Sequence, residues 1–157
     1  MSDDVLPRPE ECNCLALRQA ARHVTQFYDQ HLVPAGVRTT QFSILAKLRR
    51  LGPMTINALA DEMVMDRTTL GRNVLPLQRE GLIAIRRGLT DRRSKEVHLT
   101  DAGAQRLRAA AKAWGEAQRI FEDWFGHGRA ADLRTELRAI TAGGLGPATV
   151  SASRSNR

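Results

Sequence analysis

The sequence predicts a mainly α-helical fold that carries one small β-hairpin. Apolar residues recur every three or four positions through most of the chain, as they do along one face of a helix. Glycine- and proline-containing breaks separate these stretches. One segment, residues 82–99, instead contains two short β-type runs around a charged turn. Two short helices directly before this hairpin make the centre of the chain a winged helix-turn-helix, with further helices at both ends.

The first helix is expected from about residue 14 to residue 31. Its apolar residues share one face, and the sequence Pro34-Ala35-Gly36 ends the element. Residues 1–11 are expected to form a flexible tail. The apolar face consists of Leu17, Ala21, Val24 and Tyr28.

A second helix is expected to begin at a cap formed by Thr39 or Thr40 and to end at Leu51, before Gly52-Pro53. Met54-Thr55 is expected to add a very short strand to the hairpin. A third, short helix should cover residues 55–62, and only Val64-Met65 separates it from the next helix.

The fourth helix, residues 66–80, has two different faces. Leu70, Val74 and Leu77 share one side, whereas Thr68, Arg72 and Arg79 lie opposite. Pro76 predicts a bend, or an end to the groove-reading part near Leu75. Such a second helix with a polar outer face can lie in the major groove of DNA.

Gly81 ends this helix, and residues 82–85 and 96–99 form the two strands of the hairpin. Gly88 and Asp91 supply residues typical of a turn. Thr100 should cap a long helix to Phe125, and a last helix is expected over residues 130–141.

Apolar helices at both ends predict a homodimer. Residues 14–38 and 100–142 are assigned to dimerisation, residues 39–99 to a DNA-binding lobe and residues 143–157 to a second flexible tail, all within one domain of 157 residues. The last helix has its apolar residues Leu133, Leu137 and Ile140 on one side.

The charge pattern favours a nucleic-acid partner. The net charge is +7, and residues 66–99 carry eight basic against four acidic residues, the densest excess in the chain. Arginine accounts for 21 of the 24 basic residues; it suits phosphates and guanine edges, although a GC-rich genome gives the same bias. The interpretation as a nucleic-acid-binding protein therefore rests on the clustering of basic residues within residues 66–99.

The sequence gives little support for an enzyme, a metalloprotein or a membrane protein. The four histidines lie apart from acidic or cysteine residues at metal-ligand spacing, and there is no Gly-rich loop or nucleophile elbow, so no enzyme, metal or cofactor is predicted. No apolar run is long enough to span a membrane, and the first residues do not resemble a signal peptide. The predicted location is the cytoplasm.

Several of these residues resemble a known family. The strings D-R-T-T-L-G-R-N-V, G-L-I and D-R-R-S-K-E-V-H-L-T-D-A-G are similar to those of the multiple-antibiotic-resistance-regulator (MarR) family of bacterial transcription factors. The resemblance extends over about residues 14–140, and it implies a homodimeric DNA-binding regulator at the bacterial nucleoid. The wing signature is formed by Asp91, Arg93, Val97, Leu99, Thr100 and Gly103.

We assign predicted roles to the residues of the DNA-binding surface. Thr68, Thr69 and Arg72 are expected to reach base edges in the major groove, whereas Arg67 and Arg79 hold phosphates. Arg93 is expected to enter the minor groove beside Arg92. Asp91 is expected to orient Arg93 through an ion pair.

The resemblance also implies release from DNA by a small, often aromatic and anionic effector. Arg18, Tyr28 and Gln41 are candidate residues for its site, although a buried tyrosine or a solvated arginine is the simpler interpretation of each.

A second mechanism is suggested by Cys14. The spacing Cys14, Leu17, Arg22, Thr25, Tyr28 resembles the organic-hydroperoxide-sensing branch of the family, whereas Arg18 and Phe42 stand where that branch has tyrosines. Redox sensing by Cys14 and an inert thiol thus both remain open. A further alternative is an architectural protein that binds DNA without sequence preference.

Overall fold

The computed structural model describes residue 6 and residues 8–145. The chain divides into two compact units, with the boundary between Ala117 and Gln118, and each unit is described separately below. Most of the predicted tails, residues 1–5, 7 and 146–157, lies outside the described residues. Within the predicted N-terminal tail, Pro9–Glu11 forms a single 3-10 turn, η1, rather than an irregular segment.

The first long helix, α1, spans Asn13–Leu32, one residue beyond the predicted bounds at each end. Cys12 caps it, because the Cys12 Sγ accepts a hydrogen bond from the Leu15 backbone N–H at 3.4 Å. Leu32 is the one buried residue of this helix. The predicted apolar face of α1 is therefore still largely uncovered in the single chain.

A 3-10 turn, η2 (Val33–Ala35), and Gly36 connect α1 to α2 (Thr39–Leu51). The prediction that Thr39 or Thr40 caps α2 is wrong, because Arg38 occupies the N-cap position. The Arg38 backbone N–H donates to Gln41 Oε1 at 2.9 Å. Thr39 instead donates hydrogen bonds from its backbone N–H and its hydroxyl to Asp29 Oδ1 of α1, both at 2.7 Å.

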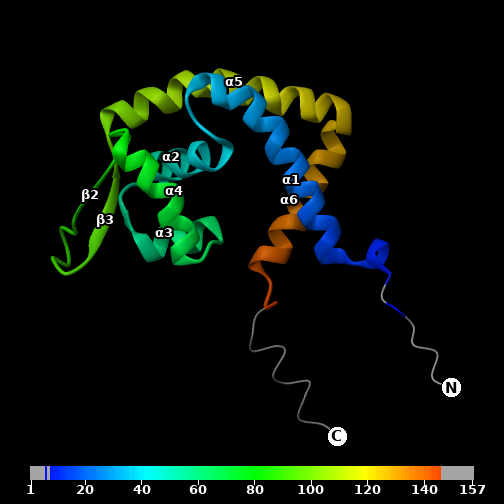
Figure 1. Cartoon of the computed structure of the whole chain (residues 1–157), viewed down its shortest axis with the longest axis horizontal. Helices are drawn as coiled ribbons and strands as arrows, with labels where there is room; N and C mark the ends of the chain where they lie inside the picture. Colours follow the sequence, from blue (N-terminus) through cyan, green and yellow to red (C-terminus); the bar gives the residue numbers. More distant parts are fainter. Residues whose placement is uncertain (1–5, 7, 146–157) are drawn as a thin grey trace, which may run out of the picture. The chain divides into compact units, whose positions relative to one another are not determined.

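Three short strands form the sheet: β1 (Met54–Thr55), β2 (Ile83–Arg87) and β3 (Lys95–Leu99). They are antiparallel in the order β1-β3-β2, with Met54 opposite Val97 and Ile85 also opposite Val97. The predicted strand at residues 54–55 is confirmed. The β2–β3 hairpin projects from the helices of the lobe (Figure 1), and β2 runs two residues further into the basic segment than predicted.

The helix-turn-helix consists of α3 (Ile56–Met63) and α4 (Arg67–Arg79). Both helices are present at the predicted positions. Pro76 lies inside α4, and the helix continues to Arg79. Whether the groove-reading part ends near Leu75 stays a prediction. Leu70, Val74 and Leu77 are buried, which confirms the inward face of this helix.

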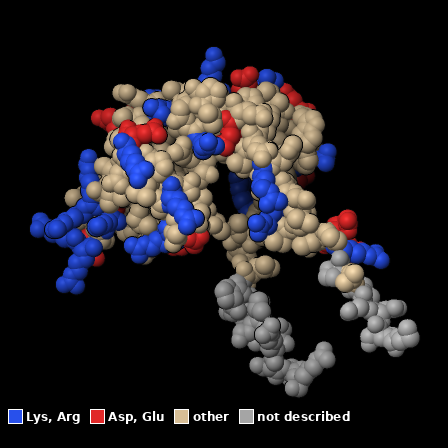
Figure 2. Space-filling view, viewed as in Figure 1, with Lys and Arg blue, Asp and Glu red and all other residues tan. Residues whose placement is uncertain are grey.

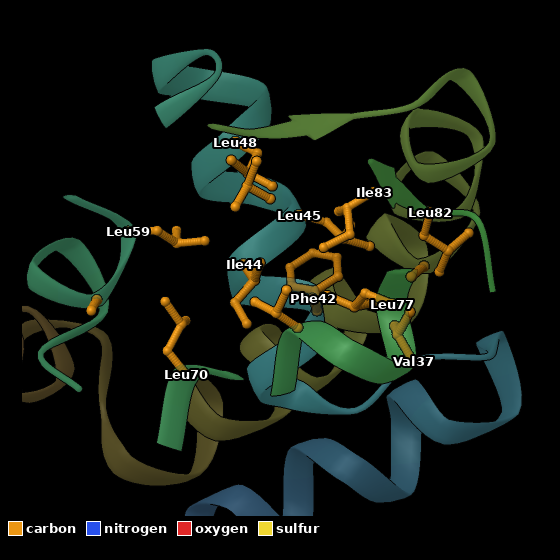
Figure 3. Packing of buried hydrophobic residues seen from close by; sticks show 14 of the residues in the cluster. Val37, Phe42, Ile44, Leu45, Leu48, Leu59, Leu70, Leu77, Leu82 and Ile83 are labelled. Carbon is orange, nitrogen blue, oxygen red and sulfur yellow. The ribbon is translucent and has the colours of Figure 1, made fainter. Parts of the chain in front are cut away.

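One apolar core joins α2, α3, α4 and the sheet (Figure 3). Its centre consists of fully buried aliphatic side chains that come from each of these elements. Phe42 of α2 also reaches the half-exposed Trp114, with a ring-centroid distance of 5.9 Å. The largest fully buried side chains are Leu32, Ile44, Leu45, Leu59, Leu70, Leu77, Ile83 and Val97.

The helix α5 spans Asp101–Phe125. The predicted cap is confirmed: Thr100 Oγ1 accepts from the Gly103 backbone N–H at 3.0 Å and donates to the Gly81 carbonyl at 2.6 Å. A side chain at Gly103 would collide with the Leu82 carbonyl oxygen. The start of α5 is thus held directly against Gly81 and Leu82, which connect α4 to β2.

The second unit contains the end of α5 and α6 (His127–Ala142), which begins three residues earlier than predicted because Gly126 alone, at φ 99°, breaks the helix. Glu122 accepts hydrogen bonds from Gln118 Nε2 at 2.7 Å and from Arg134 Nη1 at 2.8 Å. These contacts, led by the one from Gln118, lower the pKa of Glu122. They fix the turn between α5 and α6.

Candidate nucleic-acid interface

The turn between α3 and α4 sets the direction of the second helix. Thr55, the last residue of β1, caps α3 by accepting from the Ala58 backbone N–H at 3.1 Å. Val64 ends α3 in the left-handed conformation at φ 52°, which a β-branched residue rarely adopts. The Met65 backbone N–H then returns to the Ala60 carbonyl at 2.9 Å. These contacts hold the short connection between α3 and α4.

Asp66 caps the recognition helix α4. Its Oδ1 accepts from the Thr69 backbone N–H at 2.8 Å, and its Oδ2 accepts from the Thr69 hydroxyl at 2.6 Å. These bonds, the hydroxyl's first, hold the pKa of Asp66 below its ordinary value. Thr69, predicted to reach base edges, donates its hydroxyl proton to this cap, so only its oxygen lone pairs and methyl group are left for another contact.

The outer face of α4 carries exposed polar side chains whose arginines form no ion pair within the described residues. Thr68, Arg72 and Arg79 are exposed, as predicted, and so is Arg67 at the start of the helix. No ion pair to any of these three arginines occurs within the described part of the chain. Arginines without an internal carboxylate partner keep their full capacity to bind phosphates or base edges.

The wing turn joins β2 to β3 through residues 88–94. The Gly88 backbone N–H donates to the Ser94 carbonyl at 3.0 Å, which extends the ladder by one step. A side chain at Gly88 would lie only 2.7 Å from the Asp91 carbonyl oxygen and would also collide with Ser94 Oγ. Glycine is therefore required at this position by close packing within the turn.

Asp91 acts on the backbone of Arg93 rather than on its guanidinium. Asp91 Oδ1 accepts from the Arg93 backbone N–H at 2.9 Å, and the Asp91 carbonyl accepts from the Ser94 hydroxyl at 2.7 Å. The predicted ion pair is absent from the described contacts of these residues. Asp91 thus shapes the turn, and the guanidinium of Arg93 is left exposed.

The structure adds two arginines that the sequence-based assignment missed. Arg86 and Arg87 belong to β2, where they lie opposite Glu96 and Lys95, and both are exposed. The charged segment next to the wing was visible in the sequence, but its division between strand and turn was not. Lysine and arginine side chains gather over this hairpin in Figure 2. The exposed basic residues of the hairpin are Arg86, Arg87, Arg92, Arg93 and Lys95.

Arg106 of α5 connects two other parts of the lobe, and sequence reasoning did not single it out. Its Nη1 donates to the Gly36 carbonyl at 2.8 Å and lies 3.4 Å from Glu80 Oε2. Gly36 ends the connection after α1, and Glu80 is the C-cap of α4. Only a three-dimensional structure reveals this contact, because its partners are up to 70 residues apart.

The three candidate effector residues lie in different environments. Arg18 is exposed on α1, and Tyr28 is half-buried, edge-on to Phe27 at a ring-centroid distance of 5.6 Å. Gln41 already uses its side-chain oxygen to cap α2 at Arg38. Their common role in an effector site therefore stays a prediction.

Both cysteines are free and exposed, Cys12 as the cap of α1 and Cys14 in its first turn. No group of three or more His, Cys, Asp or Glu residues that could hold a metal ion occurs among residues 8–145. None of the helices in the part of the chain that the structure describes combines the length and apolar character needed to cross a membrane.

Comparison with known proteins gives consistent matches to transcriptional regulators. The model of the MarR family matches residues 38–95. The chain is 32% identical over 84 residues to the HTH-type transcriptional regulator YwoH of Bacillus subtilis; the match covers 54% of this chain and 61% of that relative, less than two thirds of its length.

Two solved structures extend the match over nearly the whole chain. The M. tuberculosis transcriptional regulator MosR, solved in complex with DNA, is 32% identical with a TM-score of 0.75, covering 92% of this chain and 99% of its own. A probable transcriptional regulator from Pseudomonas aeruginosa is 27% identical with a TM-score of 0.76, covering 85% and 99%.

Proposed function

Because this chain belongs to the MarR family of DNA-binding transcriptional regulators, we propose that it acts as a homodimeric repressor. In this proposal it binds a pseudo-palindromic operator in the bacterial cytoplasm and leaves the operator when a small aromatic or anionic effector binds. MosR, a relative at 32% identity, was solved in complex with DNA, which supports double-stranded DNA as the partner.

The observation that carries the proposal is the set of free arginines on α4 and the hairpin. Residues 66–99 have twice as many basic as acidic residues. None of the arginines in this segment forms an ion pair within the described part of the chain. A surface that leaves so many cations without a carboxylate partner is suited to a polyanion. These arginines are Arg67, Arg72, Arg79, Arg86, Arg87, Arg92 and Arg93.

Each element has a proposed role in recognition. Thr68, Thr69 and Arg72 read base edges in the major groove, Thr69 through its oxygen lone pairs and methyl group; a paired arginine contact discriminates by about 1–3 kcal/mol. Arg67 and Arg79, at the two ends of α4, hold phosphates. Arg93, with Arg92, enters the minor groove, and Asp91 keeps the backbone in the required shape.

The homodimer is supported by apolar side chains that the single chain leaves exposed. Leu17 of α1 and Trp124, Leu133 and Ile140 of the second unit are all exposed. In a homodimer in which a second copy covers them, the two recognition helices would be related by a two-fold axis. Such an arrangement fits half-sites about one helical turn, ~34–36 Å, apart.

The direct test is titration of an operator, selected by the protein from random duplexes, at several salt concentrations. Arg72→Ala should lower affinity by about 1–3 kcal/mol and relax sequence preference at one position. Arg79→Ala should reduce the salt slope by about one, because one phosphate contact is lost. Arg108→Ala, an exposed arginine on α5, serves as a matched control.

The proposal fails if the variants of α4 bind like the Arg108 variant. Equal competition by random duplex would instead favour an architectural protein that binds DNA through charge alone. For the effector, ligands that raise thermal stability and release DNA should lose their effect in Arg18→Ala, Tyr28→Phe or Gln41→Ala.

A second candidate mechanism is a thiol switch at Cys14, favoured by the exposure of this side chain in the first turn of α1. Oxidation of an accessible thiol would change the polarity of this turn. Free thiols are titrated before and after peroxide treatment, and operator affinity is measured in parallel. Loss of binding that is absent in Cys14→Ser supports the switch; unchanged binding with full oxidation excludes it.

A further inference from the structure

The wing turn holds an apolar side chain out into solvent. Leu89 is 91% exposed; among the large hydrophobic residues that the structure describes, only Leu145, at the end of the described chain, is as exposed. It directly follows Gly88, the last residue of the hydrogen-bonded ladder. An apolar side chain in this position gains nothing from folding and gains only when another molecule covers it.

The turn that carries Leu89 is firmly built. The hydrogen bonds from Arg93 and Ser94 to Asp91 close it on one side, and the Gly88 backbone bond to Ser94 closes it at its base. A Cβ added at Gly88 would lie 2.7 Å from the Asp91 carbonyl oxygen, so the backbone is closely packed at this point of the turn. A turn whose backbone is held by its own hydrogen bonds before it binds loses less entropy on binding.

The surroundings of Leu89 specify the chemistry of the occupant. Arg87 precedes the turn, and Arg92 and Arg93 follow within four residues; all three are exposed and have no ion pair within the described residues. A leucine flanked in sequence by free arginines matches a partner that carries anions next to an apolar surface. At the minor groove of a duplex, phosphates line the rims, and the stacked faces of the bases offer an apolar surface to a side chain that inserts between two steps.

We propose that Leu89 is an apolar wedge that enters the minor groove beside Arg93 and partly unstacks one base step. The inference rests on the proposed function, since it requires the wing to lie on DNA. Leu89 would add sequence preference without a hydrogen bond, because pyrimidine–purine steps such as TA and CA unstack most easily. The duplex would be bent at the two wing positions of the operator.

The experiment uses the full chain and an operator selected from random duplexes by the wild-type protein. Leu89→Asn removes the apolar character at similar size, and Leu89→Met retains an apolar side chain of similar reach. Because Leu89 is 91% exposed and is not part of the core, both variants should fold, which circular dichroism checks. Affinity, salt slope, the bend angle by end-to-end energy transfer and the fluorescence of 2-aminopurine at the wing step are measured.

Leu89→Asn should weaken operator binding about tenfold while leaving the salt slope unchanged, because the phosphate contacts remain. It should also reduce the bend and the 2-aminopurine signal, whereas Leu89→Met stays within about twofold of wild type in affinity. Replacing the TA or CA step by a stiffer step should remove the difference between the wild-type protein and Leu89→Asn.

Arg93→Ala separates this inference from the proposed function. If Arg93→Ala weakens binding and lowers the salt slope while Leu89→Asn changes neither affinity nor bend, the wedge is excluded and the wing assignment stands. If the wild-type protein selects no operator, or if Arg72→Ala and Arg93→Ala both bind like wild type, the proposed function fails first.

Discussion

The recognition lobe and the flanking helices use their apolar residues differently. Leucines, isoleucines and valines from α2, α3, α4, β2 and β3 meet in one core, to which Leu32, Val37 and Ala110 also belong. In contrast, α1 buries only Leu32, and Ala130 is the one buried residue among residues 118–145. The lobe is therefore complete within one chain, whereas the flanking helices carry an apolar surface that a second copy would have to cover.

Truncation inside the lobe should have the largest effect. Leu45 is fully buried between α2 and the sheet, and Leu45→Ala should lower the free energy of unfolding by about 2–5 kcal/mol through lost contacts and a cavity. Denaturant titration measures this loss. Leu51→Ala, at the exposed end of the same helix, is the control; a similar loss in both variants would contradict the description of a closed core.

A charge on a flanking helix should affect assembly instead. Leu137 of α6 is exposed, and Leu137→Glu should raise the dimer dissociation constant about a hundredfold, equivalent to about 2.7 kcal/mol, because the carboxylate would be desolvated at the interface. Sedimentation equilibrium measures the change. Arg138→Gln, at the neighbouring position, changes the net charge by the same −1 and reports the effect of charge alone; a monomeric wild-type protein would refute the inferred dimer.

Gly36 lies where the two regions join. Its φ of 85° is left-handed, and an added Cβ would approach Arg106 Nη1 to 2.6 Å, so Gly36→Ala should cost about 1–2 kcal/mol of stability. Thermal unfolding measures the loss. Combining it with Arg106→Ala should recover the part that is due to the collision; a strictly additive double variant would show that backbone strain alone is responsible.

The smallest predicted effect concerns acid sensitivity of the recognition helix. Thr69→Ala should raise the pKa of Asp66 toward its ordinary value of 3.8, because the hydroxyl is the main cause of the depression. In the wild type the lowered pKa stabilises the fold above about pH 3.8, and this contribution is lost as the pH falls through the lower, folded value. NMR titration of the Asp66 carboxyl group measures this change in pKa. The control variant Thr68→Ala should leave the Asp66 titration unchanged.

Sequence patterns predicted the elements well where the signal is local. Helical periodicity placed α4 and its buried face, and Thr100 identified the start of α5. Met54-Thr55, directly after Gly52-Pro53, was predicted as a very short strand that completes the sheet of the hairpin, and it forms β1.

The predictions failed where three-dimensional contacts, some between distant residues and one within a tight turn, decide which partner a side chain takes. Thr39 looks like a helix cap, but Asp29 of the preceding helix takes both of its donors, and the cap moves to Arg38. Asp91 was expected to pair with the side chain of Arg93, but the tight turn brings the nearer backbone N–H to it first. The bridge made by Arg106 has no sequence signature, since its two partners come from separate elements.

The continuity of β1 and α3 has a consequence for the shape of DNA that the protein accepts. Thr55 is both the last residue of the strand that pairs with β3 and the cap of the first helix of the helix-turn-helix. The hairpin and the recognition helix are thereby connected through Thr55, which fixes the spacing between them. A duplex whose neighbouring grooves are spaced differently must deform before it can contact both the hairpin and the recognition helix. The stiffness of the intervening base pairs would therefore contribute to sequence preference.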